Sequence, residues 1–205
     1  MRALTLDTGD IFGWAFGDPY KDMIPFSGSF HLPDLPPSAK MIALENFVIN
    51  IIKANEITDV YVEQNFIPTT TSFQAITVLA GYVLMSAIAA TRCNCKASTI
   101  ELSTWRKELG LPTQGPKTVL SHPDYKHFAT NKNTGAARKP KDALSEARRR
   151  WVKDRAMDYA RKMGADPKDD NEGDAICMWL YKKQRLLKKL EAIGTKRDLF
   201  DDLKI

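Results

Sequence analysis

The sequence predicts an α/β fold in which a mixed five-stranded sheet, three antiparallel strands plus parallel strands, is flanked by helices. The first observation is the order of segments: three strand-like stretches are followed by helix, strand, helix, strand and then helices. The second is spacing, because strands joined by a few residues pair antiparallel, whereas strands joined through a helix usually pair in parallel. The third is size, since 205 residues with 43% hydrophobic content suffice for one domain with a buried core.

The first three strands are expected close together near the N-terminus. Residues 2–6 (RALTL), 13–17 (GWAFG) and 25–32 (PFSGSFHL) are β-prone, and the Gly, Asp and Pro residues between them are typical of turns. An amphipathic helix follows, because apolar residues recur at positions 41, 42, 44, 47, 48, 51 and 52. This succession favours an antiparallel meander that leads into the first helix.

The middle of the chain alternates strands and helices. Residues 59–66 (DVYVEQNF) predict a strand, 72–91 a helix, 96–102 (KASTIEL) a further strand and 103–110 a short helix. The uncharged stretch AITVLAGYVLMSAIAA in the longer helix has about 16 residues, fewer than the roughly 20 that span a bilayer. We therefore expect this helix to be buried on all sides in a protein core, with no membrane as a partner.

The C-terminal half adds two features to the single domain expected for residues 1–205. Residues 111–140, which include TQGP and NKNTGAARKP, show no periodicity and predict a basic loop insertion. Helices are expected at 141–163 and from about residue 170. The last helix is expected to continue into a C-terminal helical extension at about 182–205.

Basic charge is concentrated in one part of the chain. The net charge is +5, but residues 106–162 hold 15 Lys and Arg against 6 Asp and Glu, so the remainder is net acidic. Such a segment indicates a polyanionic partner, although a solvated helix face and a basic loop give the same count. No signal peptide is apparent, and three cysteines fit a reducing compartment, so a cytoplasmic location is expected. Cys93 and Cys95 are too closely spaced for a usual zinc site.

Acidic residues stand where separate elements are expected to converge. Asp7 ends the first strand, and Glu63 lies near the end of the fourth. If these strands are parallel neighbours, their carboxyl ends meet at one edge of the sheet. Asp170 and Asp174 share a face of the last helix, with Asn171 also one turn before Asp174. Oxygen ligands without thiolate or imidazole favour Mg²⁺ or Mn²⁺.

Each acidic group also has a purely structural interpretation. Asp7-Thr8-Gly9 is a common turn sequence, and acidic residues at positions 169–172 are favourable at a helix N-terminus through capping and the helix dipole. Glu63 is harder to explain in this way, because a carboxylate in an apolar strand must be paired or coordinated. Asp174 lies nearly a turn inside its helix, directly before an apolar run. The order of the motifs along one fold is the stronger signal.

Taken together, these motifs resemble those of the RuvC-like Holliday junction resolvases of the ribonuclease H-like superfamily, in the versions carried by phages and prophages. The matching segments are LTLDTGDIFGWAF, DVYVEQNF and DDNEGDAICMW, and STWRKELG is similar to a Trp-Arg-Lys segment of the phage members. The match runs from residue 2 to about 181. It implies a ribonuclease H-like fold and, for a phage protein, the cytoplasm of a bacterial host.

The resemblance also implies roles for individual residues. Asp7, Glu63 and Asp174 match catalytic, metal-binding carboxylates. The family's fourth acidic position is held by Asn171, so either its amide oxygen ligates the metal or Asp170 on the same helix face does, and Asp170 is preferred as the catalytic residue.

The family further uses a lysine ahead of the last acidic motif. Lys153 and Lys141 fit this role by spacing, and Lys153 is taken as the catalytic lysine.

The activity implied is hydrolysis of DNA phosphodiester bonds with two Mg²⁺ or Mn²⁺ ions per active site. Branched DNA and a second copy of the chain are the expected partners, because resolvases of this kind act as dimers on junctions with two-fold symmetry. The helix at 72–91 is suited to offer a face to that dimer. The expected phosphate contacts are basic residues of the positive segment: Arg106, Lys107, Arg138, Lys139, Lys141, Arg148, Arg149 and Arg150.

Aromatic residues offer a further contact with DNA. Trp105 or Phe128 suits stacking on an unpaired base, although Trp105 suits core packing better.

Three other functions agree with parts of the sequence. A flap, branched-DNA or RNA–DNA hybrid nuclease would use the same fold, and a catalytically weakened junction-binding protein would explain Asn171. An actin-like ATPase also begins with a D-x-G loop, but it needs a second D-x-G motif and a chain nearly twice as long. A metal-dependent nuclease for branched DNA remains the principal hypothesis.

Overall fold

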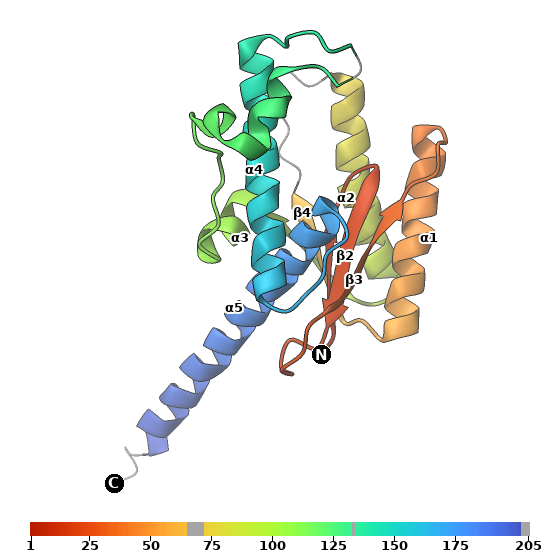
Figure 1. Ribbon diagram of the computed structural model, residues 1–205. Helices are drawn as coiled ribbons and strands as arrows, with labels where there is room; N and C mark the ends of the chain where they lie inside the picture. The colour runs from red at the N-terminus through yellow and green to blue at the C-terminus, as the bar shows by residue number, and fades with distance from the viewer. Residues whose placement is uncertain (65–71, 133, 202–205) are drawn as a thin grey trace.

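The structure, a computed structural model, describes residues 1–64, 72–132 and 134–201. Its centre is a five-stranded sheet with the strand order β3-β2-β1-β4-β5 (Figure 1). Strands β1, β2 and β3 form an antiparallel meander, and β4 lies parallel to both β1 and β5. The predicted mixed five-stranded sheet is therefore confirmed. The strands are β1 (Ala3–Asp7), β2 (Ile11–Gly17), β3 (Phe26–His31), β4 (Asp59–Gln64) and β5 (Lys96–Glu101).

Helices cover both faces of the sheet. One hydrophobic cluster joins β1 and β4 to α1 (Pro37–Asn55) and α2 (Phe73–Arg92). A second joins the opposite face to α3 (Leu102–Glu108), α4 (Pro140–Lys162) and α5 (Asp170–Asp201). Residues 65 and 66 of the predicted fourth strand lie outside the described residues. The protein is thus a helix–sheet–helix sandwich, as the order of its segments predicts.

Side-chain alternation along β1 decides which face carries the acidic groups. Leu4 and Leu6 point into the cluster with α1 and α2. Thr5 points the other way, and its hydroxyl donates a hydrogen bond to the carbonyl of Ala175 in α5 at 2.8 Å. Because the strand period is two residues, Asp7 also points toward the α5 side.

Helix α2 differs from the expected helix buried on all sides. Its buried residues are Tyr82, Ser86, Ala89 and Ala90, whereas Phe73 is 81% and Leu84 59% exposed. The helix packs on α1, β4 and β5 with one side, and its apolar composition continues around the opposite side. By length and composition it also suffices to cross a membrane, a test that helices covering a protein core pass as well.

The segment predicted as an irregular loop insertion is partly ordered. It contains the short 3₁₀ helices η1 (Val119–Ser121) and η2 (Pro123–Ala129), which pack on α4 through Val119, Tyr125 and Ala147. Near the start of this segment, Gly115 lies directly against α4, because an added Cβ would be only 2.7 Å from the Cα of Arg148. The segment is therefore held against α4 along part of its length.

The C-terminal extension is continuous with the acidic helix. Helix α5 is 32 residues long, and its C-terminal part runs away from the sheet as an arm (Figure 1). Its first turns pack on β1 and β2, which places the acidic residues from position 169 onward beside the sheet. The expected extension at about 182–205 is helical as far as Asp201, where the described residues end.

Candidate active site

Two acidic residues meet at the carboxyl ends of β1 and β4. Leu6 pairs with Val62 in the parallel ladder, so Asp7 and Glu63 follow side by side on the face toward α5. Both are buried, with 7% of each residue exposed, and their carboxyl groups are within hydrogen-bonding reach of each other. The parallel pairing thus brings together two acids 56 positions apart in the chain.

The first turn of α5 lies unusually close to β2. Gly13 is paired with Asp7 in the antiparallel ladder, and a Cβ on Gly13 would lie 1.9 Å from the carbonyl oxygen of Asn171. No residue with a side chain fits there without moving the backbone. Gly13 therefore permits the close approach that brings α5 beside Asp7.

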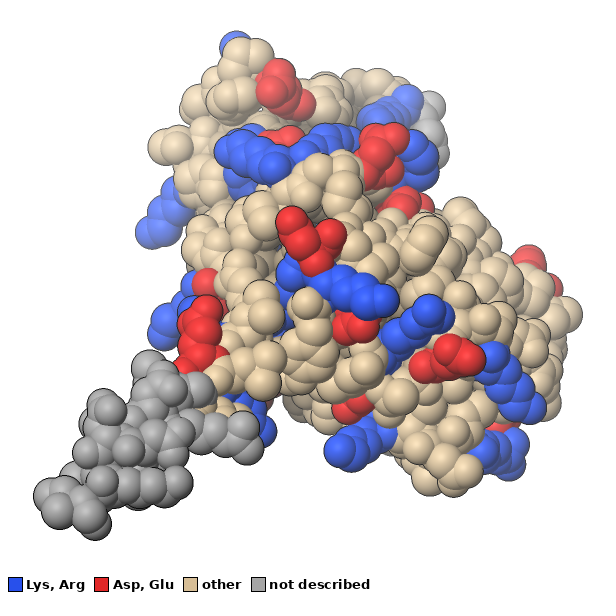
Figure 2. Space-filling view, turned by 90° about the horizontal axis from the view of Figure 1, so that it is seen from below, with Lys and Arg blue, Asp and Glu red and all other residues tan. Residues whose placement is uncertain are grey.

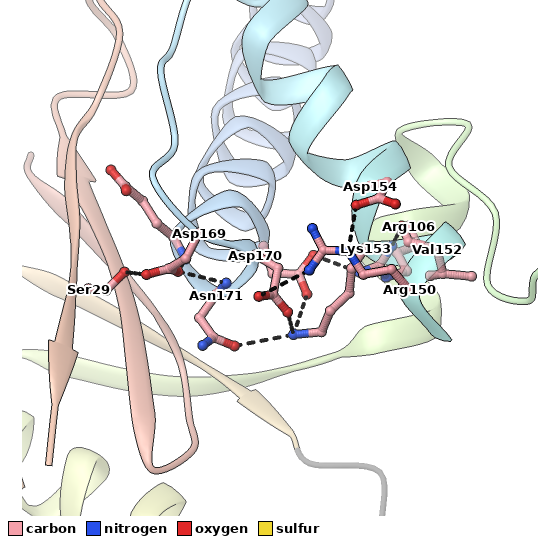
Figure 3. A network of polar contacts seen from close by, with 11 residues as sticks. Ser29, Arg106, Arg150, Val152, Lys153, Asp154, Asp169, Asp170 and Asn171 are labelled. Carbon is pink, nitrogen blue, oxygen red and sulfur yellow. Dashed lines mark hydrogen bonds and ion pairs between the residues drawn. The ribbon is translucent and has the colours of Figure 1, made fainter. Parts of the chain in front are cut away.

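Two of the acidic residues at the start of α5 cap the helix. Asp169 Oδ1 accepts hydrogen bonds from the backbone N–H groups of Asn171 (3.0 Å) and Glu172 (2.9 Å), and Ser29 donates to its other oxygen (Figure 3). Glu172 accepts from the Ser27 hydroxyl and from the Lys168 N–H, each at 2.7 Å. These contacts satisfy orphan donors of the first turn and tie it to β3.

Asp174 completes the acidic cluster one turn further along α5. It is 3% exposed, and its Oδ1 accepts a hydrogen bond from Nη2 of Arg106 at 2.6 Å. Its Oδ2 lies 4.0 Å from Nζ of Lys153. Asp7, Glu63 and Asp174 come from three separate elements and occupy one buried region, as the sequence predicts.

Lys153 of α4 points toward Asp170 and Asn171 in the first turn of α5 (Figure 3). Its Nζ is 2.5 Å from Oδ2 of Asp170 and 3.2 Å from Oδ1 of Asn171. Lys141, the other candidate, lies twelve residues earlier on α4, about 18 Å along the helix axis. Of the two lysines, Lys153 is the one in contact with the acidic residues.

Asp170 and Asn171 occupy different positions relative to the cleft described below. Asp170 forms ion pairs with Lys153 and, at 3.9 Å, with Arg150, and it does not line the cleft. Asn171 lines the cleft together with Asp174. Asn171 therefore lines the cleft while its amide oxygen accepts a hydrogen bond from Lys153, whereas the Asp170 carboxylate faces Lys153 and Arg150.

Burial and mutual repulsion make the three central acids weak. Burial raises the pKa of Asp7 and, with the charges of Asp7 and Asp174, raises that of Glu63 well above its usual value. Burial raises the pKa of Asp174 to about 7, because the desolvation exceeds the opposing effect of Arg106.

The pKa values of Asp170 and Lys153, which form an ion pair beside these three acids, shift in favour of the charged forms. Burial raises the pKa of Asp170, but contact with Lys153 outweighs it and lowers the pKa overall. Burial by itself lowers the pKa of Lys153. The acids around it, above all Asp174, together have the larger effect, so the pKa is raised overall. Lys153 is therefore a permanent cation beside the cluster.

The donor set fits a divalent cation. Asp7, Glu63 and Asp174 offer carboxylate oxygens, and Asn171 an amide oxygen, which are the ligands that Mg²⁺ and Mn²⁺ prefer. Burial is the largest cause of the raised pKa values of Glu63 and Asp174, and repulsion between the carboxyl groups adds to it, so a bound cation would stabilise their ionised forms. Within residues 1–64, 72–132 and 134–201, no three His, Cys, Asp or Glu side chains are already grouped at metal-binding spacing.

A cleft of about 960 Å³ opens above the acidic cluster. Asp7, Glu63 and Asp174 line one part of it, and Leu79 of α2 lines the side opposite α4. The wall formed by α4 is basic: it presents Lys141, Ser145, Arg148, Arg149, Val152 and Lys153, which recur at helical spacing. The acidic cluster therefore forms the floor of the cleft, and the basic side of α4 forms one of its walls.

The eight expected phosphate contacts are not equivalent. Lys141, Arg148 and Arg149 line the cleft, and Arg148 also donates to the carbonyl of Gly115 at 2.6 Å. Arg106 also lines the cleft, but it is only 1% exposed and its guanidinium is bound to Asp174, so it is poorly placed for the phosphate contact expected from the sequence.

The remaining four expected contacts lie outside the cleft lining. Arg150 forms an ion pair with Asp154 at 2.8 Å, and the others are Lys107, Arg138 and Lys139.

Basic residues do not gather on every face. Seen from below in Figure 2, Lys and Arg side chains are interspersed with Asp and Glu, with no large area of one sign. The cleft is lined by Asp7 and Glu63, which stand at the carboxyl ends of β1 and β4. The basic wall of α4 is therefore the more suitable surface for a polyanion.

Trp105 packs in the core, as preferred from the sequence, but sequence reasoning missed its contact with an acid of the cluster. Its indole N–H donates a hydrogen bond to Oε1 of Glu63 at 2.8 Å, and the side chain is fully buried, so it is not available to stack on a base. Phe128 is half-buried and stacks on Tyr125 within the η2 segment. The adjacency of Trp105 to Arg106 in STWRKELG is the one signal that could have linked the two residues to the acids.

Comparison with known proteins identifies the fold. No family model and no curated protein matches the chain. Among solved structures, RuvC of Thermus thermophilus in complex with a Holliday junction substrate has a TM-score of 0.56 at 10% identity, covering 88% of this chain and 91% of that one. A second Thermus thermophilus RuvC structure has a TM-score of 0.50 at 13% identity, covering 88% and 92%. The chain thus has the ribonuclease H-like fold of RuvC, as predicted.

Proposed function

We propose that this chain is a metal-dependent endonuclease that cuts branched DNA, with four-way junctions as its substrate. The observation that carries the proposal is the convergence of Asp7, Glu63 and Asp174 beneath a cleft with a basic wall. The RuvC-like fold supports it, since one of the similar RuvC structures holds a Holliday junction substrate.

The chemistry proposed is hydrolysis of a phosphodiester bond. Two Mg²⁺ or Mn²⁺ ions would supply activation of water and neutralisation of the charge on the attacking and leaving oxygens. Asp7, Glu63 and Asp174 would hold them, with the Asn171 oxygen beside them. Lys153 places a fixed positive charge next to the same region, where negative charge grows on the phosphate during cleavage.

The DNA backbone would follow the wall formed by α4. Lys141 and Arg149 are exposed there and suit direct phosphate contacts, while Arg148 both lines the cleft and holds Gly115. Lys139 is exposed directly before α4, and Lys107 is exposed on α3. Binding through such contacts weakens steeply with salt, because each neutralised phosphate releases counterions.

We further propose that two copies act together. The outer side of α2 exposes large apolar side chains, Phe73 and Leu84, which a second copy would cover. A two-fold dimer would offer two active sites to the two symmetric strands of a junction. The likeness of STWRKELG to phage members supports a phage or prophage source and action in the cytoplasm of the host.

The decisive experiment compares the wild type with Asp174→Asn on a labelled four-way junction with Mg²⁺ or Mn²⁺. Flaps, RNA–DNA hybrids and linear duplexes are assayed in parallel. We expect paired nicks in the junction by the wild type, and binding without cleavage by Asp174→Asn. Asp166→Asn is the matched control, because Asp166 is exposed and its ion pair is with Lys168, which is exposed as well.

Each outcome has a definite meaning. Equal cutting by the wild type and Asp174→Asn would overturn the site assignment. Junction binding without cutting by the wild type would favour a non-catalytic junction-binding protein. Preferred cutting of flaps or hybrids would keep the nuclease and change its substrate.

A further inference from the structure

We propose that Trp105 and Arg106, two consecutive residues of α3, are positioning residues that hold the metal-binding carboxylates Glu63 and Asp174 in place. This inference rests on the proposed function. The sequence alone suggested a core or stacking role for Trp105 and a phosphate contact for Arg106. Trp105 is indeed in the core at 0% exposed, Arg106 is buried at 1% exposed, and each is in addition bonded to a different acid of the cluster.

The two contacts have good hydrogen-bond geometry. Trp105 Nε1 donates to Oε1 of Glu63 at 2.8 Å. Arg106 Nη2 donates to Oδ1 of Asp174 at 2.6 Å, and its Nη1 donates to the carbonyl of Val152 in α4 at 3.1 Å. The guanidinium thus links α3 to both α4 and α5. Each bond fixes one oxygen of its carboxylate and so restricts the rotation of that group.

The course of the chain explains how one short helix reaches both acids. Strand β5 pairs in parallel with β4, placing Ile100 opposite Glu63, and α3 begins two residues later at Leu102. Adjacent helix residues point about 100° apart, so Trp105 and Arg106 face different neighbours. One reaches β4 and the other reaches α5. Helix α3 therefore sets the separation of two acids that come from different elements.

Packing alone does not account for Arg106. A buried ion pair is often no more stabilising than apolar residues of the same volume, because both charges lose their hydration. Moreover, Nε of Arg106 is buried without an acceptor among the described residues, which adds a further cost. Arg106 is therefore expected to add little to the stability of the fold, whereas its position is suitable for orienting Asp174.

Trp179 provides an internal comparison for Trp105. Both indoles are fully buried in the same hydrophobic cluster. The Trp179 N–H has no acceptor within the described part of the chain, whereas the Trp105 N–H is bonded to Glu63. The core therefore accepts a tryptophan whose N–H has no partner, so packing does not require the bond from Trp105 to the acid.

The test measures Mn²⁺ affinity of the whole chain by electron paramagnetic resonance of the free ion. The variants are Trp105→Phe and Arg106→Lys, with Trp179→Phe as the matched control. We expect affinity to fall by about 10–100-fold in the first two, the usual effect of losing a residue that orients a metal ligand. Trp179→Phe is expected to bind Mn²⁺ like the wild type, even where it lowers the unfolding temperature by as much as Trp105→Phe does.

A second measurement applies where a variant does not fold. In wild-type protein labelled with ¹⁵N at the indoles, the Trp105 N–H signal is expected to shift when Mg²⁺ is added, and the Trp179 signal is not. Unchanged Mn²⁺ affinity in Trp105→Phe and Arg106→Lys, or an unmoved Trp105 signal, would overturn the positioning role while leaving the nuclease proposal intact. Failure of the wild type to bind Mn²⁺ at all would overturn the proposed function and this inference with it.

Discussion

Nζ of Lys153 lies 2.5 Å from Oδ2 of Asp170, and it also donates a hydrogen bond to the amide oxygen of the next residue, Asn171, at 3.2 Å. The contact joins the middle of α4 to the first turn of α5, beside the buried Asp7 and Asp174. Because the surrounding acids keep Lys153 charged, one side chain of α4 provides a cation that faces several carboxylates. Lys153 is thus the link between the basic wall of the cleft and its acidic floor.

Removal of this charge should impair cleavage more than DNA binding. We predict that Lys153→Met lowers the single-turnover rate of junction cleavage by about 10²–10³-fold, the usual effect of losing one group that stabilises developing negative charge. Junction affinity should change little, because many other phosphate contacts remain. Lys168→Met is the control, since Lys168 is exposed and contacts Asp166 at the surface. A cleavage rate close to that of the wild type would remove Lys153 from the catalytic set.

The positions of Asp170 and Asn171 predict different consequences of their removal. Asn171 lines the cleft, so we expect Asn171→Ala to weaken Mn²⁺ binding, by about tenfold. Asp170 faces Lys153 and Arg150, so Asp170→Ala should leave Mn²⁺ affinity nearly unchanged and lower the cleavage rate by releasing Lys153. Titration with Mn²⁺ and single-turnover assays separate the two effects. The reverse order of affinities would make Asp170 the ligand, as preferred from the sequence.

The raised pKa of Asp174 predicts how stability depends on pH without metal. Burial raises this pKa to about 7 in the folded protein, from the usual value near 3.8. The folded state therefore holds the proton more tightly than the unfolded state does, and the free energy of unfolding falls as pH rises from about 4 to about 7. Asp7 and Glu63 act in the same direction.

The measurement is thermal unfolding in EDTA at pH 5 and pH 8. We expect a midpoint several degrees lower at pH 8, since 1 kcal/mol corresponds to roughly 2–4 °C for a chain of this size. Asp174→Asn should shrink the difference, and the exposed control Asp34→Asn should not. A midpoint that rises between pH 5 and pH 8 in the wild type, and not in Asp174→Asn, would contradict the buried acidic cluster.

The sheet and the meeting of Asp7 with Glu63 could be predicted because both follow from short-range patterns. Turn residues separate the strands of the meander, and a helix between β1 and β4 indicates parallel pairing, which places strand ends together. The exposure of α2 could not be predicted in this way. The composition of α2 shows that it is apolar, but which of its sides meets α1 and the sheet depends on long-range packing.

The roles of Trp105 and Arg106 were hidden for a related reason. Arg106 belongs to a strongly basic segment, and this predicts a surface position. Its partner Asp174 lies 68 residues further along the chain, so the local sequence does not reveal the contact. Trp105 and Glu63 are 42 residues apart. No local periodicity encodes these pairs, because they arise only when α3 folds back over the end of the sheet. The same holds for Gly13, because the need for a glycine there arises only from the close approach of α5 in the folded protein.

The exposed side of α2 predicts the assembly state. Leu84 is 59% exposed and lies on the opposite side of the helix from its contacts with the sheet, so a glutamate there would not disturb the fold. We predict that the wild type is a dimer and that Leu84→Glu is a monomer, because the interface would have to bury an unpaired charge. Light scattering after gel filtration measures the mass, and junction assays show whether paired nicks become independent single nicks.

Leu190→Glu is the control for this prediction. Leu190 is 48% exposed and lies on the projecting part of α5, away from α2. It receives the same substitution, so a general effect of added negative charge would appear in both variants. A dimer that survives Leu84→Glu but dissociates in Leu190→Glu would place the interface on α5 and not on α2. A monomeric wild type that still makes paired nicks would show that the two cuts do not require a stable dimer in solution.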